Sequence, residues 1–324
     1  MTKEELRIVF MGTPEFAVES LRRLVEGSYN VVGVVTMPDK PMGRHQEHLS
    51  QSAVKQYAVS QGLRILQPEK LKDELFVDEL RSLKADLQIV VAFRMLPEVV
   101  WNMPPMGTIN LHASLLPQYR GAAPINWAII NGDKETGITT FFLQHEIDTG
   151  NIIKQVRIPI DDDDNVGIIH DKLMLLGGDL VLETVDNILK GEISQTPQTE
   201  LAEGVELKLA PKIFKDTCKI DWRMDMKGIH NFVRGLSPYP AAWTIMRHNG
   251  KMLNVKIYKT SCTERNSPSH KMGEVFSEED RLYVAVPDGV LEILELQLVG
   301  KKRMSAADFM RGFRMDGTEK FCCG

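Results

Sequence analysis

The chain has 324 residues, of which 43% are hydrophobic and 26% are charged, and its formal net charge is −5. This length is enough for two domains, each with its own core, and the composition is that of an ordinary globular protein. No stretch approaches the ~18 consecutive apolar residues of a membrane-spanning helix, and the first apolar run is too short for a signal peptide. We therefore expect neither a membrane protein nor a membrane partner.

The cysteines give no indication of a metal site or a disulfide framework. Cys218 and Cys262 stand alone, and Cys322 and Cys323 are adjacent. None has the spacing of metal ligands, and adjacent cysteines rarely form a structural disulfide. The simplest expectation is a reduced, cytoplasmic protein without a metal, acting as a monomer.

Charge is distributed unevenly along the chain. Residues 1–205 contain 19 Lys and Arg against 29 Asp and Glu, a net of −10, whereas the remaining residues contain 20 against 15, a net of +5. A basic second half on an acidic first half suggests a polyanionic partner for the second half. A small domain that merely happens to be basic explains the same numbers equally well.

Apolar strands alternate with amphipathic helices in the first part of the chain. Strands are predicted at 6–12, 31–36, 64–66, 86–93 and 108–113, and helices at 15–27, 52–62, 75–84 and 122–132. This alternation is typical of βαβ units around a parallel sheet. The polar segment 38–48 is expected to be a loop.

The first turn does not carry the dinucleotide-binding fingerprint. It reads Gly12-Thr13-Pro14 and not G-x-G-x-x-G, so the sequence does not support a nicotinamide or flavin cofactor, although the sheet looks Rossmann-like.

The pattern changes after residue 190. Residues 137–144 and 151–160 are predicted to pair antiparallel and are followed by a long amphipathic helix over 166–191. A polar linker over 191–207 leads to short strands, with "HNGK" as a type I′ hairpin turn. We thus expect an α/β fold with a Rossmann-like, mostly parallel sheet in residues 1–190 and a smaller, OB-like β-barrel in residues 208–324.

Three polar residues form the candidate catalytic set. Asn110 and His112 are two residues apart in a predicted strand, so their side chains point to the same face. Asp148 lies in the loop "HEIDTGN", and in an open α/β sheet such loops surround the ligand crevice. Each residue also has an ordinary interpretation, since a lone strand histidine is commonly structural and an Asp-Thr-Gly aspartate commonly serves only a turn.

Together the three residue types are suited to acyl transfer. An aspartate beside a histidine orients the imidazole for general acid-base work, and an asparagine amide can donate to a developing oxyanion. No serine or cysteine lies in a nucleophile motif, which disfavours a covalent acyl-enzyme. The set fits direct transfer of an acyl group between two bound substrates.

Longer motifs connect the chain to a known family. "FMGTPEFA", "NLHASLLPQYRGAAPI", "ETGITT", "IDTGN" and "VRGLSPYPAAWT" occur in this order over nearly the whole chain. They resemble the formyltransferases that use 10-formyltetrahydrofolate, and "KIDW" with "SPYPAAW" resembles the branch that acts on methionyl-tRNA. The resemblance implies formyl transfer from 10-formyltetrahydrofolate, a cosubstrate, to the α-amino group of methionine on the aminoacylated initiator tRNA, with no metal.

The resemblance also implies roles for individual residues. Asn110 would hold the formyl oxygen, His112 would manage the proton, and Asp148 would orient and stabilise His112. The implied folate-binding residues are Phe93, Arg94, Met95 and Leu96 around the pterin, and Ser114, Leu115, Leu116 and Pro117 as a wall of the site. Arg44 would contact the tRNA.

Two segments depart from the family pattern. The loop at Gly43-Arg44-His45 lacks the lysines that commonly follow, but it keeps one arginine, Arg44, at the matching position. The folate loop is one residue shorter than in many relatives, with Arg94 where glycine is frequent.

Two alternative functions stay open. One is a formyltransferase of the same core that acts on a nucleotide sugar or a purine-pathway amine. The other is a folate- or nucleic-acid-binding module without activity.

Overall fold

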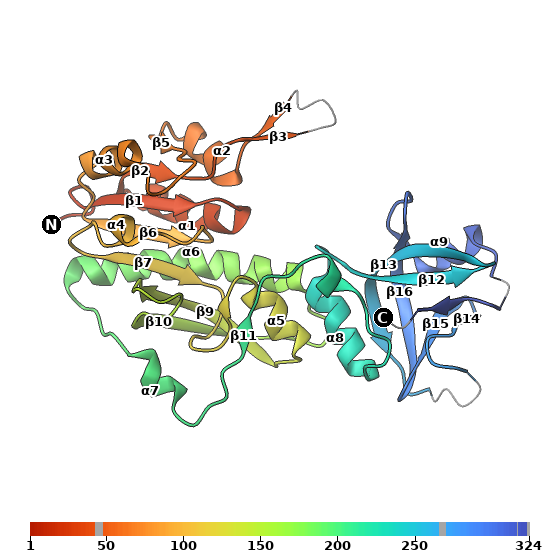
Figure 1. Cartoon of the computed structure of the whole chain (residues 1–324). Coiled ribbons are helices and arrows are strands. Elements are labelled where there is room, and N and C mark those ends of the chain that lie inside the picture. The colour runs from red at the N-terminus through yellow and green to blue at the C-terminus, as the bar shows by residue number, and fades with distance from the viewer. Residues whose placement is uncertain (43–47, 266–269, 316, 323–324) are drawn as a thin grey trace. The chain divides into compact units, whose positions relative to one another are not determined.

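The structure is a computed structural model that describes residues 1–42, 48–265, 270–315 and 317–322 (Figure 1). The chain forms two compact units. The first comprises residues 1–121, 137–158 and 170–209, and the second comprises residues 122–136, 159–169 and 210–324. None of the helices in the described part of the chain combines the length and the apolar character needed to cross a membrane.

A seven-stranded sheet forms the centre of the first unit, in the order β10-β9-β7-β6-β1-β2-β5. Its strands are β1 (Arg7–Gly12), β2 (Asn30–Val35), β5 (Ile65–Leu66), β6 (Leu87–Val91), β7 (Thr108–His112), β9 (Glu135–Phe142) and β10 (Ile152–Pro159). The strands from β5 to β7 in this order pair in parallel, and β9 is antiparallel to β7. The predicted mostly parallel sheet is confirmed.

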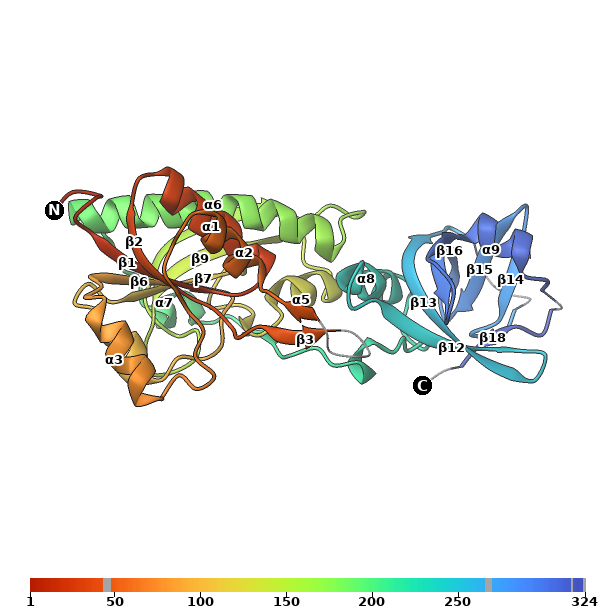
Figure 2. The same ribbon diagram turned by 90° about the horizontal axis from the view of Figure 1, so that it is seen from above.

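Helices cover both faces of this sheet. Helices α1 (Glu15–Glu26), α2 (Ala53–Ser60) and α6 (Val166–Lys190) lie on one face, and α3 (Glu74–Ser82) lies on the other (Figure 2). The core beside α3 contains Val9 and Met11 of β1, Val90 of β6 and the helix residues Phe76 and Leu80. The short α4 (Glu98–Trp101) adds Val100 to the same core. Burial on both faces explains why these strands are continuous apolar runs.

Helix α6 determines which face of β7 is free. A side-chain carbon added at Gly177 would lie 2.8 Å from both Leu111 Cδ2 and Ile138 Cδ1, so the helix packs directly onto β7 and β9. The hydroxyls of Thr140 and Thr184 are 2.9 Å apart across the same contact. Because strand residues alternate between faces, the neighbours of Leu111 in β7 point away from α6.

The second unit is built on a curled antiparallel sheet in the order β14-β15-β16-β13-β12-β18, with β17 paired to β16. The strands are β12 (Ala242–His248), β13 (Lys251–Cys262), β14 (Val275–Glu278), β15 (Arg281–Val286), β16 (Gly289–Leu298), β17 (Met304–Ser305) and β18 (Lys320–Phe321). An isolated bridge between Glu274 and Lys320 joins the two ends of the sheet. This curled sheet confirms the expected β architecture.

The second unit has its own core. Trp222 is fully buried, stacks on Phe321 with ring centroids 4.7 Å apart, and donates its indole N–H to the Thr244 hydroxyl at 2.9 Å. Asn249 and Gly250 have φ angles of 48° and 70°, as the predicted type I′ turn requires. The other elements of this unit are α5 (Pro124–Ile130), η1 (Asp216–Cys218), α8 (Met226–Leu236) and α9 (Ala306–Gly312).

Two polar segments differ from the sequence-based prediction. The expected loop over 38–48 contains paired strands β3 (Lys40–Met42) and β4 (His48–Ser50), whereas residues 43–47 lie outside the described residues. The expected linker over 191–207 contains helix α7 (Gln198–Ala202). Short strands β8 (Arg120–Gly121) and β11 (Leu209–Ala210) were also not predicted. Elements this short carry too few residues for a periodic pattern.

We expect Gly177→Val to destabilise the first unit, because its side chain would enter the packed contact with Leu111 and Ile138. Overpacking of a core typically costs about 1–3 kcal/mol. Urea unfolding followed by circular dichroism measures the loss. The matched control is Gly312→Val, at a glycine whose added carbon meets nothing within 4 Å. Equal unfolding midpoints for the two variants would contradict the packing described here.

Candidate active site

Strand β7 presents Asn110 and His112 side by side on the face away from α6. In the sheet register Asn110 pairs with Phe141 and His112 pairs with Thr139, both in β9. His112 is buried, whereas Asn110 is half-buried. Among the described residues the Asn110 amide has no hydrogen-bond partner, so its N–H groups are available to a ligand.

The His112 ring is oriented by a backbone carbonyl. Its Nε2 lies 2.8 Å from the carbonyl oxygen of Tyr119. Because a carbonyl oxygen only accepts hydrogen bonds, Nε2 carries a proton in either charge state of the ring. Tyr119 has a φ of 61°, an uncommon backbone conformation for an aromatic residue. The residue in this conformation is the one whose carbonyl contacts His112. Nδ1 is therefore the nitrogen that can gain or lose a proton.

Asp148 lies on the Nδ1 side of the ring. One carboxylate oxygen, Oδ2, is 3.8 Å from His112 Nδ1 and accepts a hydrogen bond from the Gly121 N–H at 3.0 Å. The side chains of His112 and Asp148 are 8% and 12% exposed, so both charges would be largely shielded from bulk solvent. At this distance, longer than a hydrogen bond, the carboxylate stabilises a protonated ring by charge.

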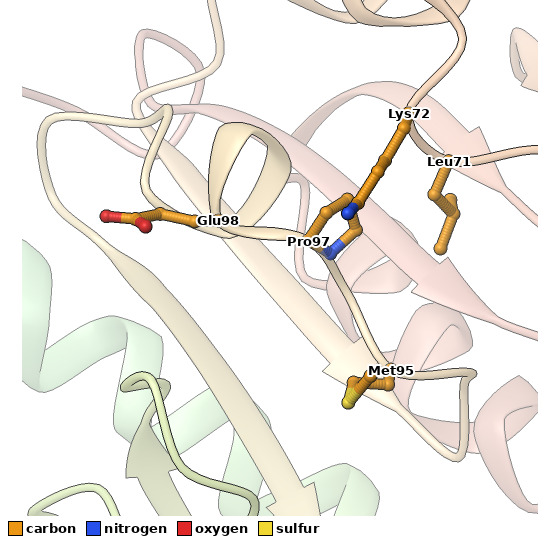
Figure 3. Close-up of a pocket in the computed structure, with 5 residues that line it drawn as sticks. All are labelled: Leu71, Lys72, Met95, Pro97 and Glu98. Carbon is orange, nitrogen blue, oxygen red and sulfur yellow. The ribbon is translucent and has the colours of Figure 1, made fainter.

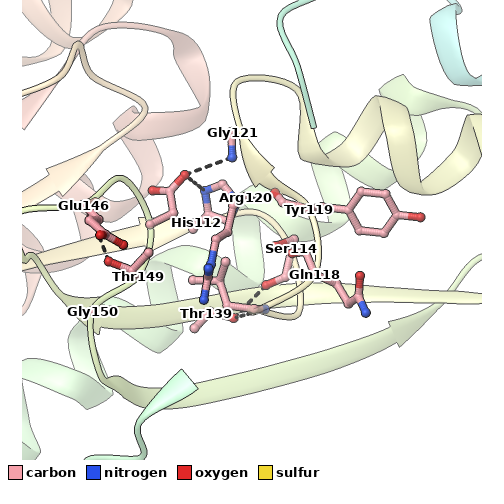
Figure 4. A network of polar contacts seen from close by, with 12 residues as sticks. His112, Ser114, Gln118, Tyr119, Arg120, Gly121, Thr139, Glu146, Thr149 and Gly150 are labelled. Atoms are coloured by element: carbon pink, nitrogen blue, oxygen red, sulfur yellow. Dashed lines mark hydrogen bonds and ion pairs between the residues drawn. The ribbon is translucent and has the colours of Figure 1, made fainter. Parts of the chain in front are cut away.

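The turn after β7 is held by the hydroxyl of Thr139 (Figure 4). Thr139 Oγ1 donates to the Ser114 carbonyl at 2.6 Å and accepts from Gln155 Nε2 at 2.9 Å. Gln155 Nε2 also donates to the Leu116 carbonyl at 2.7 Å, and Ser114 Oγ donates to the Gln118 carbonyl at 2.6 Å. These bonds fix the backbone that leads from His112 to Tyr119.

The residues predicted as a folate-site wall are largely packed within the chain. Ser114 is fully buried, Pro117 is buried, and Leu116 is 2% exposed in a small core with Phe141 and Ile152. The partly buried Leu115 lies against Gly137, where an added side-chain carbon would meet its Cδ2 at 2.5 Å. This segment can shape the site mainly through its backbone and the Leu115 side chain.

The segment Phe93–Leu96 follows β6, the parallel neighbour of β7, so it leaves the sheet at the edge where His112 lies. Leu96 is 8% exposed in the core beside α3, and Phe93 packs against the same core. The Arg94 guanidinium donates to the carbonyls of Pro68 and Glu69, and burial lowers the pKa of this group. Arg94 thus fastens the segment to the loop after β5.

Met95 is the exposed member of this segment. It is 76% exposed and lines a pocket of about 280 Å³ with Leu71, Lys72, Pro97 and Glu98 (Figure 3). Neither Asn110, His112 nor Asp148 lines this pocket. The structure therefore brings the three catalytic candidates together, and other residues line the pocket beside Met95.

Several contacts of the site were not anticipated from the sequence. The Tyr119 carbonyl and Gly121 N–H are backbone groups, which no residue pattern identifies, and Thr139 and Gln155 are ordinary strand residues. Arg44 lies outside the described residues. Within the described ranges, no group of three or more His, Cys, Asp or Glu side chains is arranged to hold a metal ion.

Comparison with known sequences places the chain among formyl transferases. Residues 6–185 match the formyl transferase family, and residues 212–314 match the formyl transferase C-terminal domain. The chain is 64% identical over 319 residues to the methionyl-tRNA formyltransferase of Parabacteroides distasonis, covering 97% of this chain and 98% of that protein. It is 52% identical over 319 residues to the enzyme of that name from Porphyromonas gingivalis, with the same coverage.

Solved structures share the fold at low sequence identity. WlaRD, a sugar 3N-formyl transferase, superimposes with a TM-score of 0.66 at 20% identity over 92% of this chain and 99% of that chain. HypX from Aquifex aeolicus, in complex with tetrahydrofolic acid, gives a TM-score of 0.62 at 20% identity over 96% of this chain. The chain spans about half the length of HypX, 48%.

We expect Thr139→Val, which keeps the side-chain shape, to destabilise the turn after β7. The change leaves the buried Ser114 carbonyl without the hydroxyl donor and takes one acceptor from Gln155, and such losses typically cost about 1–3 kcal/mol. Denaturant unfolding measures the cost. Thr149→Val is the control, because its hydroxyl donates to the Glu146 carbonyl at an exposed site. A cost no larger than that of the control would rule out the bracing role of Thr139.

Proposed function

The chain belongs to the formyl transferase family, and on that premise we propose that it transfers a formyl group from 10-formyltetrahydrofolate to the α-amino group of methionyl-tRNA. The products are formylmethionyl-tRNA, used in translation initiation, and tetrahydrofolate. Relatives named methionyl-tRNA formyltransferase include proteins that are 52%, 64% and 66% identical and match nearly the whole chain. The observation that carries the chemistry is the unpartnered Asn110 amide beside a His112 ring whose Nε2 is already bonded.

In the proposed reaction the neutral α-amine attacks the formyl carbon. A bond forms between the amine nitrogen and that carbon, and the carbonyl electrons move to its oxygen. The Asn110 N–H donates to this oxyanion, as preorganised donors in acyl-transfer sites do. His112 Nδ1 receives the amine proton, and Asp148 stabilises the resulting imidazolium. As the oxyanion collapses, the bond to the folate nitrogen breaks, and that nitrogen receives the proton.

We place the folate between the segments after β6 and β7. Phe93, Arg94, Met95 and Leu96 would line the pterin region, with backbone groups meeting the ring edge. The bonds from Arg94 to Pro68 and Glu69 support this assignment by fixing the segment. Residues Ser114–Pro117, braced by Thr139, would form the opposite wall. The proposed donor is a folate in its 10-formyl form.

We further propose that residues 208–324 bind the tRNA as a separate domain joined to residues 1–190. The excess of 20 basic over 15 acidic residues from residue 206 onward suits a polyanion. Arg44 remains a proposed tRNA contact outside the described residues. The monomeric state also remains a prediction.

The alternative substrate class is an amino sugar on a nucleotide, since WlaRD shares the fold. A panel of amines offered with 10-formyltetrahydrofolate distinguishes the readings, with tetrahydrofolate release and product mass as readouts. We expect formylation of methionyl-tRNA alone. Transfer to a nucleotide-linked amino sugar or a purine-pathway amine in place of methionyl-tRNA would overturn the proposal. So would a result in which no amine of the panel is formylated.

Removal of any member of the catalytic set should lower turnover. His112→Ala removes the acid-base group, and Asp148→Asn removes the charge that stabilises its protonated form; losses of about 10²–10⁴-fold are typical for acid-base function. Asn110→Ala removes an oxyanion donor, for which about 10²–10³-fold is typical. Steady-state kcat of formyl transfer is the measurement. His145→Ala and Asn102→Ala, at exposed positions, are the controls. Near-normal kcat in His112→Ala would eliminate this mechanism.

Binding of tRNA should depend steeply on salt, whereas binding of the folate should not. Each neutralised phosphate releases a counterion, so even a few contacts weaken tRNA affinity by at least about tenfold between roughly 50 and 200 mM salt. Fluorescence titrations of the full chain with tRNA and with tetrahydrofolate provide the comparison. Equal salt dependence for the two ligands would argue against phosphate recognition by the basic residues.

A further inference from the structure

The segment that follows α6 is bonded to both loops that contact His112. Ile152 and Thr196 exchange two backbone hydrogen bonds of 2.9 Å, which joins the segment to the end of the Asp148 loop. Further on, the Lys208 carbonyl accepts from the Tyr119 N–H at 2.7 Å. A stretch that the sequence predicted to be a linker is thus part of the scaffold of the candidate active site.

Gln198 is the most constrained side chain in this segment. It is 2% exposed, and its Nε2 donates to the carbonyls of Asp148 and Gly150, both at 2.8 Å. Its Oε1 accepts from Arg120 Nε at 3.0 Å and from Arg120 Nη2 at 2.7 Å. Both amide protons and the oxygen are therefore used, which fixes the orientation of the amide.

The hydrogen bonds of Gln198 reach Arg120 and the Asp148 loop, which flank the groups that contact His112. Arg120 stands between Tyr119, whose carbonyl accepts from His112, and Gly121, whose N–H donates to the Asp148 carboxylate. Asp148 has a φ of 53°, a conformation that needs support from its surroundings. Its carbonyl is bonded to Gln198, so the backbone and the carboxylate of Asp148 are fixed by the same small network.

We propose that Gln198 is a positioning residue for formyl transfer. Its amide donates to the carbonyls of Asp148 and Gly150 and thereby holds the Asp148 side chain beside His112. The proposal rests on the proposed function and deepens it, because it assigns a catalytic contribution to a residue that does not touch the reacting atoms. Its effect acts through Asp148, so its loss should lower turnover and leave substrate affinity nearly unchanged.

Two variants separate the bonds that Gln198 makes. Gln198→Met keeps the length and loses all of them, whereas Gln198→Glu keeps the acceptor for Arg120 and loses both donors. We expect kcat to fall about 10–100-fold in both, the range typical when support of a reactive group is removed. KM for both substrates should change by less than about twofold. Gln195→Met, an exposed amide in the same segment, is the control and should retain full kcat.

Coupling to Asp148 distinguishes positioning from general stabilisation. In an Asp148→Asn background, addition of Gln198→Met should change kcat by less than about twofold, because the group being positioned has already lost its charge. A further 10-fold loss in that background, or normal kcat in both single variants, would overturn the proposal. If Gln198→Met does not fold, Gln198→Glu provides the same cycle.

A readout without substrate separates this proposal from the proposed function. The Gly121 N–H donates to the Asp148 carboxylate, so displacement of Asp148 should accelerate exchange of this amide with deuterium. We expect faster exchange in Gln198→Met than in Gln195→Met. If the wild-type chain transfers no formyl group, the proposed function fails while faster exchange still supports the positioning role. Unchanged exchange at Gly121 would overturn the positioning role itself.

Discussion

The hydrogen bond from His112 Nε2 to the Tyr119 carbonyl is the constraint on which the site depends. It assigns one ring nitrogen to the backbone and leaves the other, Nδ1, facing Asp148 at 3.8 Å. It also requires the turn after β7 to bring Tyr119 back to a residue seven positions earlier in the chain. The bonds of Thr139 and Gln155, and the left-handed conformation of Tyr119, are how the chain meets this requirement.

The fold contributes by fixing both faces of β7. Close packing of α6 at Gly177 holds Leu111 on one face, and alternation then presents Asn110 and His112 on the other. Asp148 comes from the loop after β9. Because β9 is antiparallel to β7, the end of β9 lies beside Ile109, and the loop must turn back along β7 to reach His112. The network around Gln198 holds this loop in its returned position.

Much of this arrangement was predictable from the sequence. Strong apolar runs predicted the parallel sheet. The two-residue spacing of Asn110 and His112 correctly indicated that both side chains lie on the same face of β7. Asp148 was identified from its motif rather than from any periodic signal. The sequence could not identify the Tyr119 carbonyl or the Gly121 N–H, because every residue carries such groups and only the folded path selects them. Gln198 was missed because the polar segment around it has no periodicity, and its importance comes from burial.

Nitrogen NMR of the His112 ring tests the central claim most directly. Comparison of the wild-type chain with His112→Gln assigns the ring signals among the other histidines. If the Tyr119 carbonyl holds the ring as described, the neutral imidazole will carry its proton on Nε2, and Nδ1 will show the shift of an unprotonated nitrogen. A neutral ring protonated on Nδ1 would contradict the account, because Nε2 could then not donate to Tyr119 and Nδ1 could not receive the proton of the amine.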